Sequence, residues 1–200
     1  MARKTGLRQR KKEQTRRRIE AVARDLFARH GFDGVTVDEI AAGADIAPRT
    51  FFHYFATKED VALADFGARL ADLVTELDNR PSDEPPWVAL REAFLAVASD
   101  YEQQRDRLAS QFTIMAVSPS VQARSLQLQA DCEHALAASL ARRRGEGPDE
   151  TVTAGLLATS AVGAMRSSLR PWLLTGHQVS LPALLETCFH QLGRGLDEDA

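Results

Sequence analysis

Apolar positions between residues 36 and 58 recur with the spacing of two short helices joined by a tight turn. Thr36 and Glu39 form a T-x-x-E capping box, so we expect a helix to begin at Val37. The chain must then turn at Asp45, a residue type that tolerates a left-handed backbone better than most. The pattern therefore predicts that the first helix ends just before this turn.

Pro48 marks the start of the second helix, because its missing amide costs nothing at the first helical position. The pattern predicts a helix from Pro48 to Phe55, with Phe51 and Phe55 one turn apart on its buried side. Arg49 and Thr50 would then project first toward a groove of DNA. Two short helices joined in this way predict a helix-turn-helix that reads DNA.

The N-terminal segment carries a strong positive charge. Residues 1–18 contain nine Lys or Arg and one acid, a net charge of +8, and the remaining residues sum to −11 because the whole chain has −3. Such a segment suits phosphates, because each phosphate that it neutralises releases counterions and adds affinity without sequence preference. The alternative is a solvated tail that only aids solubility, and the neighbouring helix-turn-helix favours the DNA-binding interpretation.

Many further positions agree in order and spacing with one family of proteins over about a quarter of the chain. They are Thr15-Arg16, Ile19, Leu26-Phe27, Gly31-Phe32, Thr36-Val37, Glu39-Ile40-Ala41, Thr50-Phe51, Tyr54-Phe55 and Lys58-Glu59. In these positions the chain resembles the N-terminal domain of the TetR (tetracycline-repressor-like) family of bacterial transcriptional regulators.

The resemblance implies a set of side chains that contact double-stranded operator DNA. They are Arg16, Thr36, Arg49, Thr50, His53, Tyr54 and Lys58. Arg49 and Thr50 would meet base edges or phosphates in the major groove. Thr36, Tyr54 and Lys58 would hold the DNA backbone. Two alternatives remain open, since Thr36 can be a helix cap alone and Lys58 an ordinary solvated lysine.

Three positions depart from the family pattern. Asp45 stands where the family usually has Gly in the turn. Ala47 replaces the usual Ser or Thr before Pro48, which removes a helix cap typically worth ~1 kcal/mol. Phe52 occupies the place where many members have a phosphate-contacting Tyr, so His53 and Tyr54 are the expected polar contacts from this helix.

Beyond the helix-turn-helix the chain reads as amphipathic helices separated by polar or Pro-rich breaks. The expected helices are Lys58–Leu77, Trp87–Gln104, Asp106–Val117, Ser120–Arg144, Asp149–Thr175, with Pro171 kinking or ending it, and Leu181–Leu196. We therefore predict an all-α fold of about nine helices. A three-helix DNA-binding domain with a basic N-terminal arm would cover residues 1–57, and a larger helical domain for effector binding and dimerisation would cover residues 58–200.

The last two predicted helices are rich in small and aliphatic residues. These are Ala154, Leu157, Ala158, Ala161, Val162 and Ala164 on one helix and Leu184, Leu185, Cys188, Phe189 and Leu192 on the other. The resemblance implies that this pair packs against its copy in a homodimer, although an internal bundle core would give the same pattern. A dimer suits DNA recognition, because two recognition helices about 34 Å apart read a palindrome.

The resemblance also implies an effector pocket among the middle helices. Its expected lining is Phe66, Leu70, Phe94, Tyr101, Phe112, Met115 and Trp172, together with Val97 and Leu128. Aromatic residues at helical spacing are also typical of an ordinary core. The segments RTFFHYF, KED and Pro171-Trp172 are similar to an actinobacterial subset that includes mycofactocin-system regulators, in which long-chain acyl-CoA effectors occur. A small hydrophobic, acyl-CoA-like effector is therefore expected.

The sequence lacks the patterns that are typical of metal sites, phosphate-binding loops and catalytic serines. Cys132 and Cys188 have no metal-ligand spacing, the five histidines form no H-x-x-x-H pair, and no Gly-rich phosphate loop or G-x-S-x-G elbow occurs. We expect no enzyme activity, metal or cofactor. The longest nearly apolar stretch, 154–165, is shorter than the ~20 residues needed to cross a bilayer. We expect a cytoplasmic bacterial protein that associates with the nucleoid when it binds DNA.

The sequence thus predicts a ligand-responsive dimeric repressor that binds a palindromic operator and that an effector releases. One alternative is a helical-bundle enzyme or small-molecule carrier whose basic N-terminus is incidental. Another is a nucleoid-associated protein that binds DNA without sequence preference.

Overall fold

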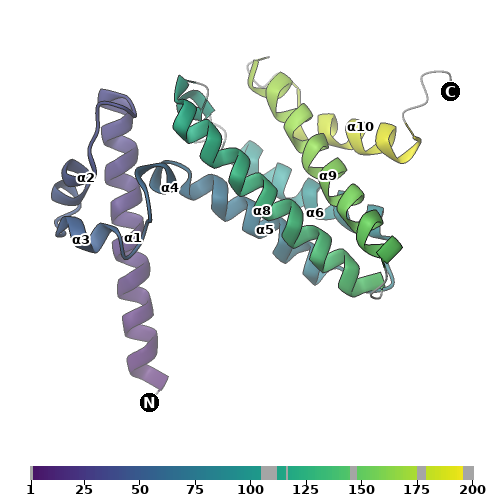
Figure 1. The fold of residues 1–200 in the computed structure, drawn as a ribbon, viewed down its shortest axis with the longest axis horizontal. Helices are drawn as coiled ribbons and strands as arrows, with labels where there is room; N and C mark the ends of the chain where they lie inside the picture. Colours follow the sequence, from purple (N-terminus) through teal and green to yellow (C-terminus); the bar gives the residue numbers. More distant parts are fainter. Residues whose placement is uncertain (1, 105–111, 116, 145–147, 175–178, 196–200) are drawn as a thin grey trace. The chain divides into compact units, whose positions relative to one another are not determined.

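The computed structural model of the protein describes residues 2–104, 112–115, 117–144, 148–174 and 179–195. Within these ranges the secondary structure is helical and contains no strand, which confirms the predicted all-α class. The chain divides into two compact units (Figure 1). One comprises residues 1–66 and 110–125, and the other residues 67–109 and 126–200.

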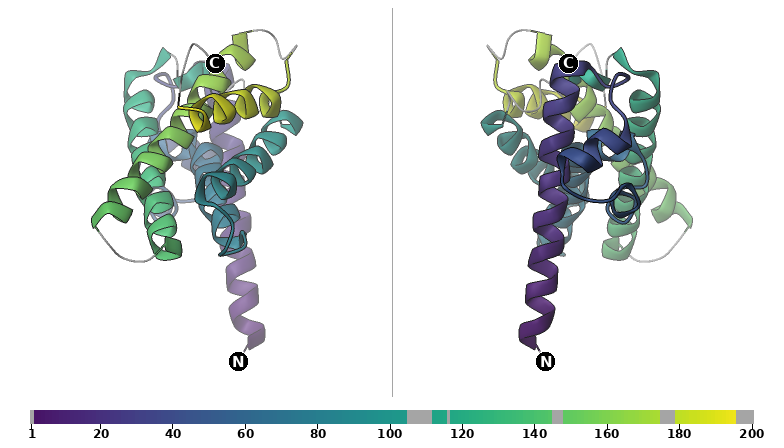
Figure 2. Two further views of the ribbon diagram at one scale, coloured as in Figure 1. Left: turned by 90° about the vertical axis from the view of Figure 1, so that its right-hand side faces the viewer. Right: turned by 90° about the vertical axis from the view of Figure 1, so that its left-hand side faces the viewer.

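The first unit is built on a long N-terminal helix, and Figure 2 shows two short helices lying against it. Its helices are α1 (Ala2–His30), α2 (Val37–Gly43), α3 (Pro48–Phe51) and α4 (Lys58–Ala62), and it includes the first residues of α5 (Ala64–Asn79) and of α8 (Pro119–Arg144). Apolar side chains from each of these helices are buried: Ile19, Ala23, Phe27, Ile40, Ala41, Phe51, Val61, Phe66 and Val121. The predicted three-helix domain is therefore present, with α1 as its base.

The basic N-terminal segment forms the first part of α1, which begins at Ala2. Lys and Arg side chains at positions 10–12 and 16–18 are exposed. Among residues 9–30 of the helix, Ile19 is the first that is fully buried. The positive charge is thus carried on a helical surface that continues into the helix-turn-helix.

Two helix boundaries near the DNA-binding domain differ from expectation. The predicted helix Pro48–Phe55 ends at Phe51. The residues after it form a turn with two hydrogen bonds that span three residues, from His53 N–H to Thr50 O at 3.1 Å and from Tyr54 N–H to Phe51 O at 2.8 Å, and one that spans four, from Phe55 N–H to Phe51 O at 3.0 Å. The predicted helix Lys58–Leu77 occurs as α4 and α5, which are separated at Leu63. The expectation of one continuous helix was wrong at this residue.

The second unit packs the remainder of α5 and α8 with three further helices. These are α6 (Pro86–Gln103), α9 (Pro148–Leu174) and α10 (Leu181–Gly193), and α10 packs against both α9 and α6. The largest fully buried side chains of this unit are Leu77, Leu90, Phe94, Leu136, Leu140, Trp172 and Phe189. The bounds of α6, α8 and α9 agree with the predicted ones to within about a residue.

Three predicted features of the body need comment. Helix α9 continues past Pro171 and ends three residues later, at Leu174. Helix α10 ends at Gly193, earlier than the predicted Leu196. Most of the predicted helix Asp106–Val117 lies outside the described residues, and those of it that the structure describes, 112–115 and 117, are helical.

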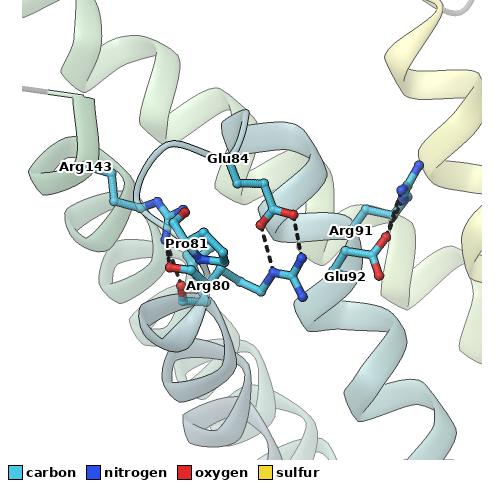
Figure 3. A network of polar contacts seen from close by, with 7 residues as sticks. Arg80, Pro81, Glu84, Arg91, Glu92 and Arg143 are labelled. Carbon is cyan, nitrogen blue, oxygen red and sulfur yellow. Dashed lines mark hydrogen bonds and ion pairs between the residues drawn. The ribbon is translucent and has the colours of Figure 1, made fainter.

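Arginine side chains fix the predicted Pro-rich connection between α5 and α6 (Figure 3). Arg143 of α8 donates to the carbonyl oxygens of Leu77 at 3.0 Å and Arg80 at 3.1 Å, and also to Pro81, so a guanidinium caps the end of α5. Arg80 makes a two-pronged ion pair with Glu84 that lowers the pKa of Glu84 and raises the pKa of Arg80. The connection is therefore held by specific contacts.

Candidate DNA-binding surface

Thr36 and Glu39 cap the first helix of the helix-turn-helix reciprocally. Thr36 Oγ1 accepts from the Glu39 N–H at 3.2 Å, and the Glu39 carboxylate accepts from the Thr36 N–H at 2.8 Å. The Thr36 hydroxyl also lies 2.9 Å from Glu39 Oε2. These hydrogen bonds from Thr36 lower the pKa of Glu39, because they favour its charged form. The predicted cap is confirmed, and a phosphate contact by the same threonine stays a prediction.

Asp45 makes the turn between α2 and α3. Its φ is 51°, and it is the one non-glycine residue with a positive φ in the described part of the chain. Hydrogen bonds hold the turn, from Asp45 N–H to Ala42 O at 3.1 Å and from Ile46 N–H to Ala41 O at 3.0 Å. The predicted left-handed conformation is confirmed, in a position where glycine would carry no steric cost.

Helix α3 and the turn after it divide their side chains between two sides. Phe51 and Phe55 are 0% and 4% exposed, as predicted, and their rings lie 5.7 Å apart. Arg49 and His53 are exposed on the outward side. Thr50 and Tyr54 are half-buried. The N-cap residue of α3 is Ala47, and no side chain caps this helix. The buried phenylalanines thus anchor a short element that turns its polar residues to solvent.

Lys58 makes intramolecular contacts that the sequence did not reveal. Its Nζ donates to the carbonyl oxygens of Phe32 at 2.9 Å and Val35 at 2.8 Å, and lies 4.2 Å from the centre of the Phe32 ring. These contacts tie the first residue of α4 to the loop that leads into the Thr36 cap. Of the two interpretations left open above, a freely solvated lysine does not fit this half-buried position.

Arg16 links α1 to the turn after α3. Its Nε donates to Glu20 at 3.0 Å, and its guanidinium carbon lies 4.7 Å from the centre of the Phe55 ring. The side chain is about half exposed, 47%. A guanidinium held in this way lies beside residues 48–55, which are α3 and the turn after it and which we call the recognition element. It retains a surface toward solvent, which fits the DNA contact that the resemblance implies.

Asp60 is a connecting residue that the sequence reasoning missed. Its Oδ2 accepts from the Thr57 N–H at 3.1 Å in a second capping box, and its Oδ1 accepts from Arg124 of α8 at 2.7 Å. A similar ion pair joins Arg24 of α1 to Asp65 of α5 at 3.3 Å. The T-x-x-D pattern at positions 57–60 could have revealed the cap and, with it, the start of a separate helix α4.

The expected effector residues fall in both compact units. Phe66, Phe112 and Met115 belong to the first unit, and Leu70, Phe94, Val97, Tyr101, Leu128 and Trp172 to the second. Of the whole set Phe66, Phe94, Val97, Tyr101 and Trp172 are buried, and Leu70, Phe112, Met115 and Leu128 are half-buried. The aromatic residues of the second unit thus form part of its core, and whether any of the nine also lines a pocket stays a prediction.

A buried charge lies beside Tyr101 in the second unit. Arg69 is 6% exposed, donates to Asp100 and Gln104 at 2.8 Å each, and lies 4.7 Å from the centre of the Tyr101 ring. Burial raises the pKa of Tyr101, and the nearby guanidinium partly opposes this. Arg69 Nε is buried and lacks a hydrogen-bond partner in the described part of the chain. No feature of the sequence pattern singled out this arginine.

A half-open cavity of about 280 Å³ lies between α6 and α10 in the second unit, and its lining differs from the expected effector residues. That lining includes Trp87, Arg91, His190 and Arg194. The Trp87 indole N–H donates to Phe189 O at 3.3 Å, which fixes the ring at one wall. Among the described residues no group of His, Cys, Asp or Glu could hold a metal, and no helix combines the length and the apolar character that a membrane span requires.

The chain is similar to known regulators over both parts. Residues 19–64 match bacterial regulatory proteins of the TetR family, and residues 84–197 match the MftR C-terminal domain. The chain is 36% identical to the mycofactocin biosynthesis transcriptional regulator MftR of Mycobacterium tuberculosis, over 94% of each chain. It is 33% identical to the HTH-type transcriptional regulator TcmR of Streptomyces glaucescens, over 84% of this chain and 77% of the relative.

The fold is likewise shared with solved structures. The crystal structure of Thermus thermophilus FadR, a TetR-family transcriptional repressor in complex with lauroyl-CoA, matches with a TM-score of 0.61 and 22% identity, over 92% of this chain and 96% of that one. A TetR-family regulator from Streptomyces coelicolor matches with a TM-score of 0.56 and 21% identity, over 91% and 94%. The fold, the helix-turn-helix and these similarities together place the chain in the TetR family of bacterial transcriptional regulators, with a C-terminal domain of the MftR type.

Proposed function

We propose that this protein is a dimeric repressor that binds a palindromic operator through α3 and releases it when a small hydrophobic effector binds. One observation carries the DNA-binding part. Phe51 and Phe55 anchor the recognition element while Arg49 and His53 face outward, on the unit that also carries the exposed basic surface of α1. That combination suits base reading in the major groove supported by phosphate contacts.

The roles within the surface follow from their positions. Arg49 and Thr50, at the start of α3, would meet base edges or phosphates. His53 and Tyr54 follow in the next turn, where a helix in the major groove approaches the backbone. Thr36, the N-cap of α2, would lie against a phosphate, because the N-terminus of a helix binds anions.

Two cationic side chains complete the proposed DNA contacts. Arg16 keeps part of its guanidinium exposed beside Phe55. Lys58 has three N–H donors, two of which bind loop carbonyls. It would contact DNA with the third donor, or favour DNA binding by positioning the loop. In this proposal residues 1–57 bind DNA, and residues 58–200 bind the effector and dimerise.

We place the dimer contact on the outward side of α9 and α10. Most of the small and larger apolar residues that suggested an interface are already buried within the second unit: Ala154, Ala158, Ala161, Val162, Ala164, Leu185 and Phe189. Val152 and Leu156 remain 72% and 67% exposed, and Leu157, Leu184, Cys188 and Leu192 are half-buried. A second copy on this face would cover the exposed aliphatic residues and bring two recognition helices to one palindrome.

We propose an effector with a long apolar body, such as a fatty acyl-CoA. The lauroyl-CoA bound in the FadR structure that shares this fold, the apolar interior of the second unit and its buried Arg69 support this choice. An acyl chain suits an apolar interior, and an arginine suits a carboxylate, phosphate or thioester oxygen. An effector of this kind would release DNA by favouring a conformation with lower operator affinity. The repressor would then act on chromosomal DNA in the bacterial cytoplasm.

The decisive experiment titrates the purified protein against the intergenic DNA upstream of its gene and against a scrambled fragment, each at two salt concentrations. We expect saturable preference for the intergenic fragment and release by dodecanoyl-CoA but not by CoA alone. An R49A variant should lose the preference and keep weak binding to both fragments. Equal binding to both fragments that salt abolishes would overturn the operator proposal, since only the basic surface would then be active.

A further inference from the structure

Phe52 places an exposed aromatic ring at the end of the recognition element. Its side chain is 56% exposed, whereas the neighbouring rings of Phe51 and Phe55 are buried. Its backbone is helical, with φ −66° and ψ −11°, so it extends the turn of α3. The ring meets that of Phe51 edge to face, with centroids 5.5 Å apart and an angle of 84° between the planes. The exposed ring is thus held by a buried one.

Phe52 lies beside Arg49, the residue that we propose meets a base. Arg49 and His53 are exposed one turn apart, and Phe52 follows Arg49 by three residues, so the two are neighbours on the helical surface. A phenyl ring carries no hydrogen-bond donor, so it cannot bind a phosphate oxygen as a tyrosine hydroxyl would. Its natural contact in a major groove is apolar, and the C5-methyl group of thymine is the apolar group displayed there.

We propose that Phe52 is a specificity-determining residue that recognises thymine by packing its ring against the C5-methyl group, next to the base that Arg49 meets. This inference rests on the DNA-binding function proposed above and adds to it a base class and the residue that selects it. Covering one methyl group corresponds to about a fourfold gain in affinity for each half-site, and to roughly fifteenfold for a dimer on two half-sites.

The test compares thymine with deoxyuridine, which lacks only the C5-methyl group and keeps every hydrogen-bonding atom. Repeated rounds of binding to a pool of random duplexes first yield the sequence that the full-length protein prefers. Each thymine of that duplex is then replaced by deoxyuridine, one symmetric pair at a time. We expect one pair of replacements to weaken binding of the unaltered protein about fifteenfold.

Three variants separate a methyl contact from a general effect on folding or affinity. F52A should bind the thymine and uracil duplexes equally, at the affinity that the unaltered protein has for uracil. F52L keeps an apolar side chain and should retain part of the preference for thymine. L126A removes another exposed apolar side chain, on α8, and should retain all of it. Because Phe52 is exposed, the F52A protein should keep the thermal midpoint of the unaltered protein.

Two results would overturn the inference while leaving operator binding intact. In one, no deoxyuridine replacement changes the affinity of the unaltered protein. In the other, F52A lowers the affinity for the thymine and uracil duplexes by the same factor. If no sequence is enriched from the pool, the proposed function itself fails, and the role of Phe52 fails with it.

Discussion

The ammonium of Lys58 lies 2.8 Å from the carbonyl oxygen of Val35, in a hydrogen bond between the first residue of α4 and the loop before α2. A second bond, to Phe32 O at 2.9 Å, and the nearby Phe32 ring hold the same cation. The loop that these contacts fix ends at Thr36, which caps α2. Lys58 therefore positions one end of the helix-turn-helix, whether or not it also meets DNA.

Replacing Lys58 with Met should destabilise the first unit. The variant keeps most of the aliphatic stem but cannot form the two charge-assisted hydrogen bonds, so we expect the free energy of unfolding to fall by about 2 kcal/mol, allowing for partial solvent screening. Urea denaturation measures this, with K11M on the exposed part of α1 as the matched control. A K58M protein as stable as the K11M protein would show that these bonds contribute nothing to stability.

The same Lys58 variant tests the proposed phosphate contact separately. The slope of log affinity for operator DNA against log salt becomes shallower by about 0.9 for each phosphate that the protein no longer neutralises. We expect the slope for K58M to decrease by about this amount for each subunit, in addition to the lower stability. An unchanged slope would limit Lys58 to positioning the loop.

Replacing Asp45 with Gly should stabilise the turn. Asp45 has a φ of 51°, which costs a residue with a Cβ atom some free energy and glycine none. Since glycine also adds freedom to the unfolded chain, we expect a net gain of about 0.5–1 kcal/mol in the free energy of unfolding. Denaturation by urea would measure the gain. D33G is the control, because Asp33 is exposed and has no positive φ, and it should show no gain.

The features of the helix-turn-helix that the sequence predicted are those encoded locally. The Thr36 cap, the Asp45 turn and the start of a helix at Pro48 each depend on residues within one helical turn of one another. The predicted end of α3 was wrong. This uncapped four-residue helix passes into a turn, and no residue type in the sequence indicates where the helix gives way to the turn. Local chemistry thus located the helix starts and the turn better than the helix end.

Contacts between distant positions were out of reach of the sequence. The partners of Lys58 lie 23 and 26 residues earlier in the chain, and Arg124 reaches Asp60 across 64 residues. A single sequence shows which side chains can form such bonds and gives no sign of which ones meet. For the same reason the sequence suggested apolar residues for a pocket without separating those of the first unit from those of the second.

The Glu39 cap should make stability depend on acid pH. Hydrogen bonds from Thr36 lower the pKa of Glu39 in the folded chain. The stability that they contribute is therefore complete above the unfolded pKa, about 4.3, and is lost as the pH falls through the lower folded value. Urea midpoints between pH 7 and pH 3 should fall less for E39Q than for the unaltered protein. E13Q, on the exposed part of α1, is the control, and equal pH dependence in all three proteins would exclude this role for Glu39.

Cys132 should be unreactive in the folded protein. Burial raises the pKa of its thiol to about 12, and its Sγ lies 3.5 Å from Leu70 O as a donor. Because the thiolate is the reactive form, very little reactive species exists near pH 7, and the 5% exposure of the side chain limits access further.

A C188S protein, which leaves Cys132 as its single thiol, should show almost no colour with Ellman's reagent when native and one thiol when denatured. The matched C132S protein reports Cys188 alone. Rapid reaction of native C188S at neutral pH would mean that the helices around Cys132 open readily, and the buried position of this thiol in the second unit would then have to be abandoned.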